Sequence, residues 1–319
     1  MKTLVTRLLT AVAAVAALTT ATACGGDTSD AGTLTVGFVV DPSWAQVPVA
    51  QQLGYFDRHG VRVKVVNFPS GVEALQALAA GQLDVATAAD VPTSATLARS
   101  ASLRVIADGS RWQGSRIVAR RSAGITSVQD LAGRSIGTPL GTSAAYFVAK
   151  ALSDNGIQAN LVQVAPSATV TAATRRDVDA VSIFQPYQAQ VAAALGADAV
   201  ELPGGSYNQH SLYLATAAAV RDKGPALTNL LAALQEAGGQ LTARSADAVS
   251  AVAAATQLEP ALLGKVLPEF DFGLQLRPEI ANELTALAQW AKGQGKIDAA
   301  ITLPDYATLI DATLLPHVG

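Results

Sequence analysis

The sequence predicts an α/β fold of two lobes, each built on a mixed, mostly parallel sheet. Short runs of β-branched residues alternate with apolar helical segments, which is the pattern of βαβ units. This alternation runs through the first third of the chain and then starts again, and 319 residues suffice for two lobes of ~100–150 residues each. We therefore expect two lobes of similar topology, joined by two strands that act as a hinge.

The first third of the chain alternates between strands and helices. We expect strands over 34–40, 61–66, 85–88 and 103–107, where valine and other apolar residues gather. We expect helices over 47–58, 71–80 and 92–99, the second of them ended by Gly81. These elements form the centre of the first lobe.

The middle of the chain repeats the pattern. We expect strands over 117–120, 135–137, 161–164 and 180–184, and helices over 127–131, 144–154, 169–175 and after Pro186. The segments 81–92 and 175–186 each run from a helix end through an aspartate into a strand, a polar residue and a proline. Their similarity indicates that the two lobes share a topology.

The last third of the chain returns to the first lobe. After a strand over 210–216 comes a long helical stretch, 225–319, broken by prolines, in which leucines recur three and four residues apart. We expect these helices to cover the first lobe, so that the second lobe is an insertion. The predicted boundaries are 33–115 with 212–319 for the first lobe and 116–211 for the second.

The N-terminus has the features of a targeting signal. A positively charged start precedes an apolar stretch that is too short to cross a bilayer. Cys24, the only cysteine, follows small residues and opens a Gly/Asp/Ser linker over 24–32, which resembles a bacterial lipoprotein site although Ala21 stands where leucine is usual. We expect residues 1–23 to be a lipoprotein signal peptide and Cys24 to carry lipid at the extracytoplasmic face of the cell membrane. Ordinary secretory cleavage with a free thiol is the alternative.

The composition argues against several classes of function. Aromatic residues are only 5% of the chain and basic residues never run beyond pairs, so the signature of a nucleic-acid binder is missing. The histidines are isolated and no second cysteine exists, so no metal-site spacing is evident. No GxSxG nucleophile motif is present. We expect no metal, no cofactor, no catalysis and no nucleic-acid partner.

One loop and helix start could hold a ligand. The stretch GTPLGTSAAYFVAKAL, 137–152, predicts a strand end, a small polar loop and an apolar helix, and it lacks the spacing and the lysine of a phosphate loop. The free N–H groups of a helix start, with the hydroxyls of Thr142 and Ser143, suit a small anion that has no positively charged partner. The alternative is that one hydroxyl merely caps the helix.

Three stretches resemble a known family, namely AQQLGYFDRHGVRVKVVNFPSGVEALQALAAGQLDVA (50–86), SVQDLAGRSIGTPLGTSAAYFVAKALSDNGI (127–157) and DAVSIFQPYQAQV (179–191). The family comprises periplasmic or lipid-anchored substrate-binding proteins of ABC importers, among them binders of aliphatic sulfonates, taurine, nitrate and pyrimidine precursors. Relatives often have Trp-Asp-Pro where this chain has Phe184-Gln185-Pro186. A carboxylate that could pair with a ligand amine is therefore absent there, which weakens the case for taurine.

The resemblance implies a two-lobed periplasmic-binding-protein-like fold of type II, whose lobes close on a ligand by hinge bending. Ligands in such sheets bind beyond the carboxyl ends of the strands. The predicted ligand-binding residues are Asp41, Trp44, Gln46, Ser70, Gly71, Asp90, Gly141, Thr142, Ser143, Phe184, Gln185, Tyr187 and His210. The aromatic residues would form apolar walls, or else only pack in the core. Asp90 conflicts with a bound anion unless it points to solvent, accepts from a cationic or hydroxylated ligand, or the ligand is no anion.

The resemblance implies an extracytoplasmic solute-binding lipoprotein, monomeric, that delivers a small organic anion of the alkanesulfonate type to an ABC permease. One alternative is a binder of a pyrimidine or thiamine precursor or another planar heterocycle. A second alternative is an enzyme on the same fold, similar to a desulfinase or a pyrimidine synthase. The single cysteine lies in the signal region and the cysteine-rich motif of the synthases is missing, which disfavours an enzyme.

Overall fold

The computed structural model describes residues 32–316. The predicted signal peptide and the predicted lipid attachment at Cys24 lie outside these residues. Between residues 32 and 316, none of the helices has both the length and the apolar character needed to cross a membrane.

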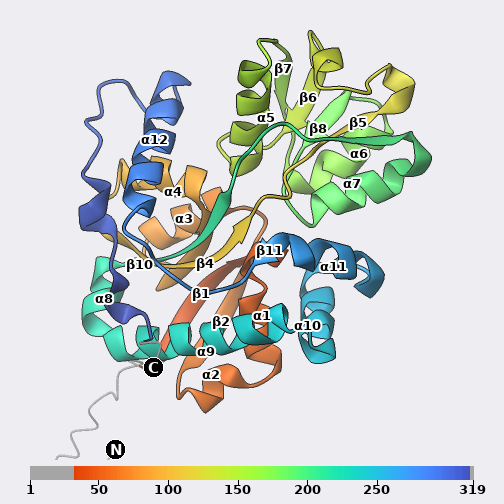
Figure 1. The fold of residues 1–319 in the computed structure, drawn as a ribbon. Coiled ribbons are helices and arrows are strands. Elements are labelled where there is room, and N and C mark those ends of the chain that lie inside the picture. The colour runs from red at the N-terminus through yellow and green to blue at the C-terminus, as the bar shows by residue number, and fades with distance from the viewer. Residues whose placement is uncertain (1–31, 317–319) are drawn as a thin grey trace, which may run out of the picture. The chain divides into compact units, whose positions relative to one another are not determined.

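The first sheet has six strands in the order β11-β4-β10-β3-β1-β2 (Figure 1). β1 pairs in parallel with β2 and β3, whereas β10 runs antiparallel to β3 and β4. All five residues of β3, VATAA, are buried, as expected for a strand covered on both faces. The strands are β1 (Thr33–Val39), β2 (Arg62–Phe68), β3 (Val85–Ala89), β4 (Leu103–Trp112), β10 (Gln209–Thr216) and β11 (Phe270–Asp271).

Helices from both ends of the described chain pack around this sheet. Figure 1 shows the long helix α9 beside α1 and α2, and its buried face consists of leucines and alanines three and four residues apart. The helices of this lobe are α1 (Gln46–Gln52), α2 (Tyr55–Arg58), α3 (Gly71–Ala79), α4 (Asp90–Leu97), α8 (Ala217–Asp222), α9 (Gly224–Thr242), α10 (Ala246–Thr256), α11 (Pro260–Val266) and α12 (Ile280–Gly293).

The second sheet has five strands in the order β7-β6-β8-β5-β9, and it repeats the parallel centre of the first sheet. β6 pairs in parallel with β7 and β8, and β5 runs antiparallel to β8 and β9. The strands are β5 (Ile117–Arg120), β6 (Ser135–Thr138), β7 (Asn160–Gln163), β8 (Ala180–Ser182) and β9 (Ala199–Leu202). The helices are α5 (Ser143–Asp154), α6 (Thr169–Thr174) and α7 (Tyr187–Leu195).

Two aspartates play the same part in the two sheets. Asp84 accepts a hydrogen bond from the N–H of Thr35 at 2.8 Å, and its own N–H donates to the Thr35 carbonyl at 2.9 Å. Asp179 accepts from the N–H of Ser135 at 3.0 Å and donates back to the Ser135 carbonyl at 2.8 Å. Each aspartate thus fixes the start of a central parallel pair, β1–β3 or β6–β8. The two similar sequence segments therefore correspond to a repeated structural element.

Several elements differ from those expected. The predicted helix over 47–58 is two helices, because Gly54 between them has a φ of +68°. β4 does not end at 107 but continues to Trp112, paired with β10 and β11. The strands β9 and β11 were not expected at all. The lobe boundaries given above stay a prediction.

Candidate functional site

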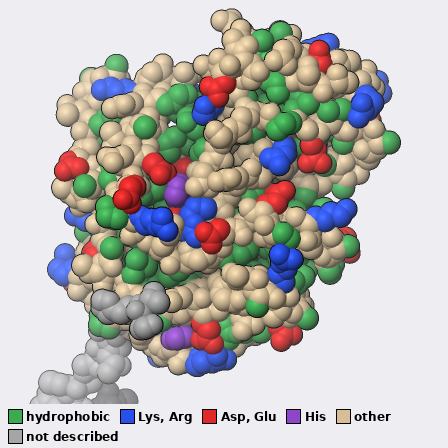
Figure 2. All heavy atoms as spheres, in the orientation of Figure 1, with side chains coloured by type: hydrophobic (Ala, Val, Ile, Leu, Met, Phe, Trp, Pro, Cys, Tyr) green, Lys and Arg blue, Asp and Glu red, His purple; other side chains and the backbone are tan. Residues whose placement is uncertain are grey.

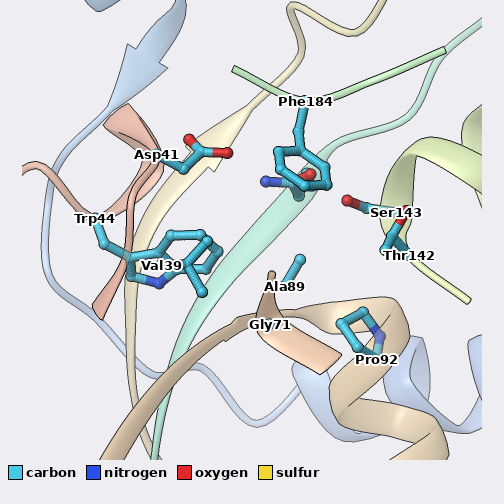
Figure 3. Close-up of a pocket in the computed structure, with 10 residues that line it drawn as sticks. Val39, Asp41, Trp44, Gly71, Ala89, Pro92, Thr142, Ser143 and Phe184 are labelled. Atoms are coloured by element: carbon cyan, nitrogen blue, oxygen red, sulfur yellow. The ribbon is translucent and has the colours of Figure 1, made fainter. Parts of the chain in front are cut away.

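A pocket lies where the carboxyl ends of strands from both sheets converge. β1 and β3 end beside it, the helix α5 begins beside it, and Phe184 reaches it from the segment after β8. Open α/β sheets bind their ligands at such ends. Ten residues line the pocket (Figure 3), namely Val39, Asp41, Trp44, Gly71, Ala89, Pro92, Thr142, Ser143, Phe184 and Gln209.

The pocket is narrow and has fixed aromatic walls. The cavity between the lining residues has a volume of only about 20 Å³. The Trp44 indole is held by a hydrogen bond from Nε1 to the Leu212 carbonyl at 3.2 Å. The Phe184 ring meets the Tyr187 ring edge-on, with centroids 6.1 Å apart. A ligand larger than water therefore needs the walls to move apart before it enters.

The start of helix α5 offers hydrogen-bond donors to the pocket. The first helical bond of its backbone runs from the Tyr146 N–H to the Thr142 carbonyl at 3.1 Å, which leaves the N–H groups of residues 143–145 without helical partners. The Thr142 side chain does not cap them, because its hydroxyl donates to the Pro139 carbonyl at 2.7 Å. The Ser143 hydroxyl makes no hydrogen bond to any residue between 32 and 316, and Figure 3 shows it pointing into the pocket.

Asp41 faces these donors from the first lobe. Its carboxylate accepts from the Ser43 N–H at 2.7 Å and caps the short 3-10 helix Pro42–Trp44. Burial raises the pKa of Asp41 to about 7, against the lowering effect of the hydrogen bonds from Ser43. None of the ten lining residues is basic. The pocket therefore combines an acceptor on one side with donors on the other.

Several predicted site residues lie beside the pocket but do not line it. Gln46 is fully buried and donates to the Gly109 carbonyl at 2.5 Å, and Ser70 caps α3 by accepting from the Glu73 N–H. Gln185 accepts from the Ala189 N–H at 3.3 Å within its own helix turn. Tyr187 supports Phe184 from behind. Gly141, with a φ of +84°, turns the chain into Thr142.

Asp90 satisfies its carboxylate within the protein. It accepts from the Tyr207 hydroxyl, from the His210 N–H at 3.2 Å and from the Val91 N–H at 2.7 Å. Burial raises its pKa to about 6, and these donors together with the charge of His210 limit the rise. Tyr207 precedes β10 and His210 lies near its start, so Asp90 anchors the start of β10 to α4. Because the hydrogen bonds of Asp90 are made within the protein and Asp90 does not line the pocket, it is the carboxylate of Asp41 that would repel an anionic ligand.

His210 lies in a different hollow, a charged groove of about 480 Å³ beside α12. Its ring bridges the carboxylates of Asp108 at 2.8 Å and Glu283 at 2.9 Å. Burial alone would lower the pKa of His210, but hydrogen bonds to the two carboxylates raise it to about 10. Figure 2 shows acidic, basic and histidine side chains side by side in a hollow of the visible face. His210 was predicted to bind the ligand, but its ring lies in this groove and does not line the pocket.

Four lining residues are not among the predicted ligand-binding residues: Val39, Ala89, Pro92 and Gln209. Side chains alternate between the two faces of a strand, so Gln209 and His210 at the start of β10 point in opposite directions. The sequence contained this signal, because only one of two adjacent polar residues can face the pocket. Val39, Ala89 and Pro92 are apolar, and nothing in the sequence separates them from core residues.

The site has the chemistry of a binding pocket. Among residues 32–316, no group of three or more His, Cys, Asp or Glu is placed to hold a metal ion. The pocket offers a hydroxyl, backbone N–H groups, one carboxylate and apolar walls, which together can orient a small polar molecule.

Comparisons with known structures place the fold. The structure is similar to that of the alkanesulfonate-binding protein SsuA from Xanthomonas axonopodis pv. citri bound to MOPS, with a TM-score of 0.72, 21% identity, and coverage of 89% of this chain and 98% of that one. It is also similar to the desulfurization enzyme DSZB, with a TM-score of 0.63, 16% identity, and coverage of 86% and 95%. The predicted two-lobed periplasmic-binding-protein-like fold is thereby confirmed.

Sequence comparisons agree with the resemblance described above. A protein of Brucella abortus (strain 2308), named as a binding protein, is 26% identical over 288 residues, which cover 85% of this chain and 88% of that protein. The family model described as "NMT1/THI5 like" matches residues 41–248. Since this match spans more than half of the sequence and both lobes, the chain belongs to the NMT1/THI5-like family.

Proposed function

We propose that this protein is the solute-binding component of an ABC importer. It captures a small organic anion of the alkanesulfonate type in the pocket between its lobes and delivers it to a membrane permease. Cys24 anchors it by lipid to the extracytoplasmic face of the membrane, and it acts as a monomer without catalysis. The observation that carries this function is the pocket itself, where donors at the start of α5 face aromatic walls at the strand ends.

The relatives support a binding role. The structurally similar SsuA is an alkanesulfonate-binding protein, and a protein of Escherichia coli (strain K12) that is 27% identical over 181 residues is named for binding aliphatic sulfonates. A sulfonate group has three oxygens that accept hydrogen bonds, which suits the Ser143 hydroxyl and the free N–H groups of residues 143–145. A few such bonds and one apolar wall suffice for a micromolar Kd, or roughly -8 kcal/mol.

A thermal-shift screen tests this function. Purified protein is heated with alkanesulfonates, taurine, nitrate or thiamine precursors, and a ligand bound only by the folded state raises the melting temperature. With the compound that gives a shift, Ser143→Ala should weaken binding about tenfold or more, because the site loses a donor. The matched control is Ser153→Ala, at the exposed far end of the same helix. Equal affinities of the two variants would remove the site assignment.

A planar heterocycle is the second candidate ligand. The observation that favours it is the presence of Trp44 and Phe184 together with the Asp41 carboxyl in one pocket, since amino-substituted rings stack on aromatic side chains and donate to carboxylates. Titrations followed by tryptophan fluorescence, with sulfonates in one series and pyrimidines in the other, separate the two candidates. The compound class whose fluorescence change saturates with the lower Kd is the ligand class.

Because the fold is similar to that of a desulfurization enzyme, an experiment should test whether the protein converts its ligand. The only cysteine of the chain is Cys24, far from the pocket in sequence and within the proposed anchor. We expect a bound ligand to be recovered unchanged after prolonged incubation with the protein, as measured by NMR of the filtrate. Conversion of the ligand in proportion to protein concentration would contradict the binding role.

A further inference from the structure

Asp41 has a buried carboxylate that can accept further hydrogen bonds from the side of the pocket. Its side chain belongs to a residue that is only 2% exposed, and all its hydrogen bonds within residues 32–316 come from Ser43. A carboxylate has about four acceptor positions, and one serine can occupy two at most. Asp41 lines the pocket, and Figure 3 shows one oxygen of its carboxylate turned toward Phe184.

No positive charge in the pocket compensates Asp41. The titratable group that faces it from the second lobe is Tyr187 on α7, whose pKa is raised by burial and by the charge of Asp41. Its hydrogen-bond partner in the first lobe is the uncharged Ser43, whose hydroxyl in turn accepts from Gln209 Nε2 at 3.3 Å. Buried polar groups in proteins almost always have hydrogen-bond partners. The open side of the Asp41 carboxylate therefore lacks a partner that the protein itself supplies.

The two ends of the pocket thus differ in polarity. Ser143 and the start of α5 present donors on one side, and Asp41 presents an acceptor on the other. Resting on the function proposed above, we propose that Asp41 is the specificity-determining residue of the pocket, and that it accepts a hydrogen bond from an N–H or O–H group of the ligand. The ligand is then a short molecule with an acceptor group at one end and a donor group at the other.

This assignment restricts the substrate class. A plain alkanesulfonate brings a second negative charge into a buried space without a cation, which is unfavourable while Asp41 is ionised. An ammonium, amino or hydroxyl group near Asp41 turns the same contact into a charge-assisted hydrogen bond. The preference for ligands with a donor group depends on the Asp41 side chain alone, so a single substitution can change it.

Pairs of compounds that differ only in the donor group test the inference. Binding of 2-aminoethanesulfonate against ethanesulfonate, and of 4-amino-2-methylpyrimidine against 2-methylpyrimidine, is measured by isothermal titration calorimetry at pH 8. Asp41→Asn preserves the cap on Ser43 and removes the charge. Asp57→Asn, an exposed carboxylate on α2, is the matched control.

One of the two pairs, sulfonates or pyrimidines, should bind to the wild type. Within that pair, the compound with the amino group should have a Kd about tenfold or more lower than the compound without it. Asp41→Asn should abolish this preference and tighten binding of the plain sulfonate, a reversal that a folding defect cannot produce. The preference should also grow between pH 6 and 8 as Asp41 ionises, and it should be pH-independent over this range in Asp41→Asn. Asp57→Asn should behave as the wild type.

The outcomes separate this inference from the function on which it rests. Equal affinity for both members of a pair, or an unchanged preference in Asp41→Asn, overturns the inference and leaves the binding function in place. Failure of all four compounds to bind overturns both.

Discussion

At the scale of single residues, two aspartates that look alike in the sequence have opposite environments. Asp41 and Asp90 both follow strands that end at the pocket, and burial raises the pKa of both. Asp90 is satisfied by Tyr207 and His210, which are far away in sequence. Asp41 has only its neighbour Ser43. The sequence around each aspartate therefore did not reveal which of the two lines the pocket.

The raised pKa of Asp41 has a consequence for stability. Its folded value of about 7 lies above the ordinary value of 3.8, so the folded protein binds more protons than the unfolded chain between these pH values. Stability from this group is therefore present at low pH and is lost as the pH rises toward 7. An asparagine at this position does not ionise, so the free energy of unfolding of Asp41→Asn should not fall with pH for this reason. Relative to the wild type, this variant should become more stable as the pH rises, by up to roughly 4 kcal/mol above pH 7.

Urea unfolding of the wild type and of Asp41→Asn between pH 4 and 8 measures this difference. Asp57→Asn controls for the loss of one negative charge at the surface. Parallel pH profiles for wild type and Asp41→Asn would mean that the Asp41 carboxyl is not desolvated in the folded state.

At the scale of elements, the hydroxyls of two adjacent residues at the start of helix α5 have different environments. The Thr142 hydroxyl is buried and bonded to the Pro139 carbonyl, whereas the Ser143 hydroxyl faces the pocket. Thr142→Ala should therefore lower the free energy of unfolding by about 1 kcal/mol. Ser143→Ala should change it by less than about 0.5 kcal/mol. Urea denaturation of the ligand-free proteins tests this order, and a larger loss in Ser143→Ala would contradict it.

The same helix is held by an aromatic cluster. The Tyr146 ring meets Tyr207 edge-on at 5.0 Å and Trp290 of α12 at 4.9 Å. Tyr146→Ala should lower the free energy of unfolding by about 2 kcal/mol and change the fluorescence of Trp290, because both ring contacts are lost. Tyr146→Phe keeps the ring and should unfold within about 0.5 kcal/mol of the wild type. Equal losses in both variants would assign the effect to the hydroxyl.

The sequence predicted most helices and strands because their apolar periods are clear. It missed β11, which has two residues and exists only through its pairing with β4. It also missed the break at Gly54 and the extension of β4 to Trp112. The two strand features depend on partners distant in sequence, and local patterns carry no information about them. The break has a local cause, because Gly54 adopts a positive φ, and the glycine in the helical pattern was its signal.

At the scale of the whole molecule, the repeated order of strands could be predicted, but the meeting of the two lobes could not. The sequence predicted the strand ends that form the pocket, and six of its predicted residues line it: Asp41, Trp44, Gly71, Thr142, Ser143 and Phe184. It could not tell that His210 binds Asp108 and Glu283 instead. That choice depends on which face of β10 meets α12, and α12 lies some seventy residues further along the chain.

The central claim is that a small solute binds at the start of α5, between the lobes. Hydrogen exchange with and without the compound that raises the melting temperature locates the ligand directly. We predict slower exchange at the N–H groups of residues 143–145, which lack helical partners, with no change in α10 as an internal reference. Protection confined to the charged groove around His210, with 143–145 unchanged, would contradict the account.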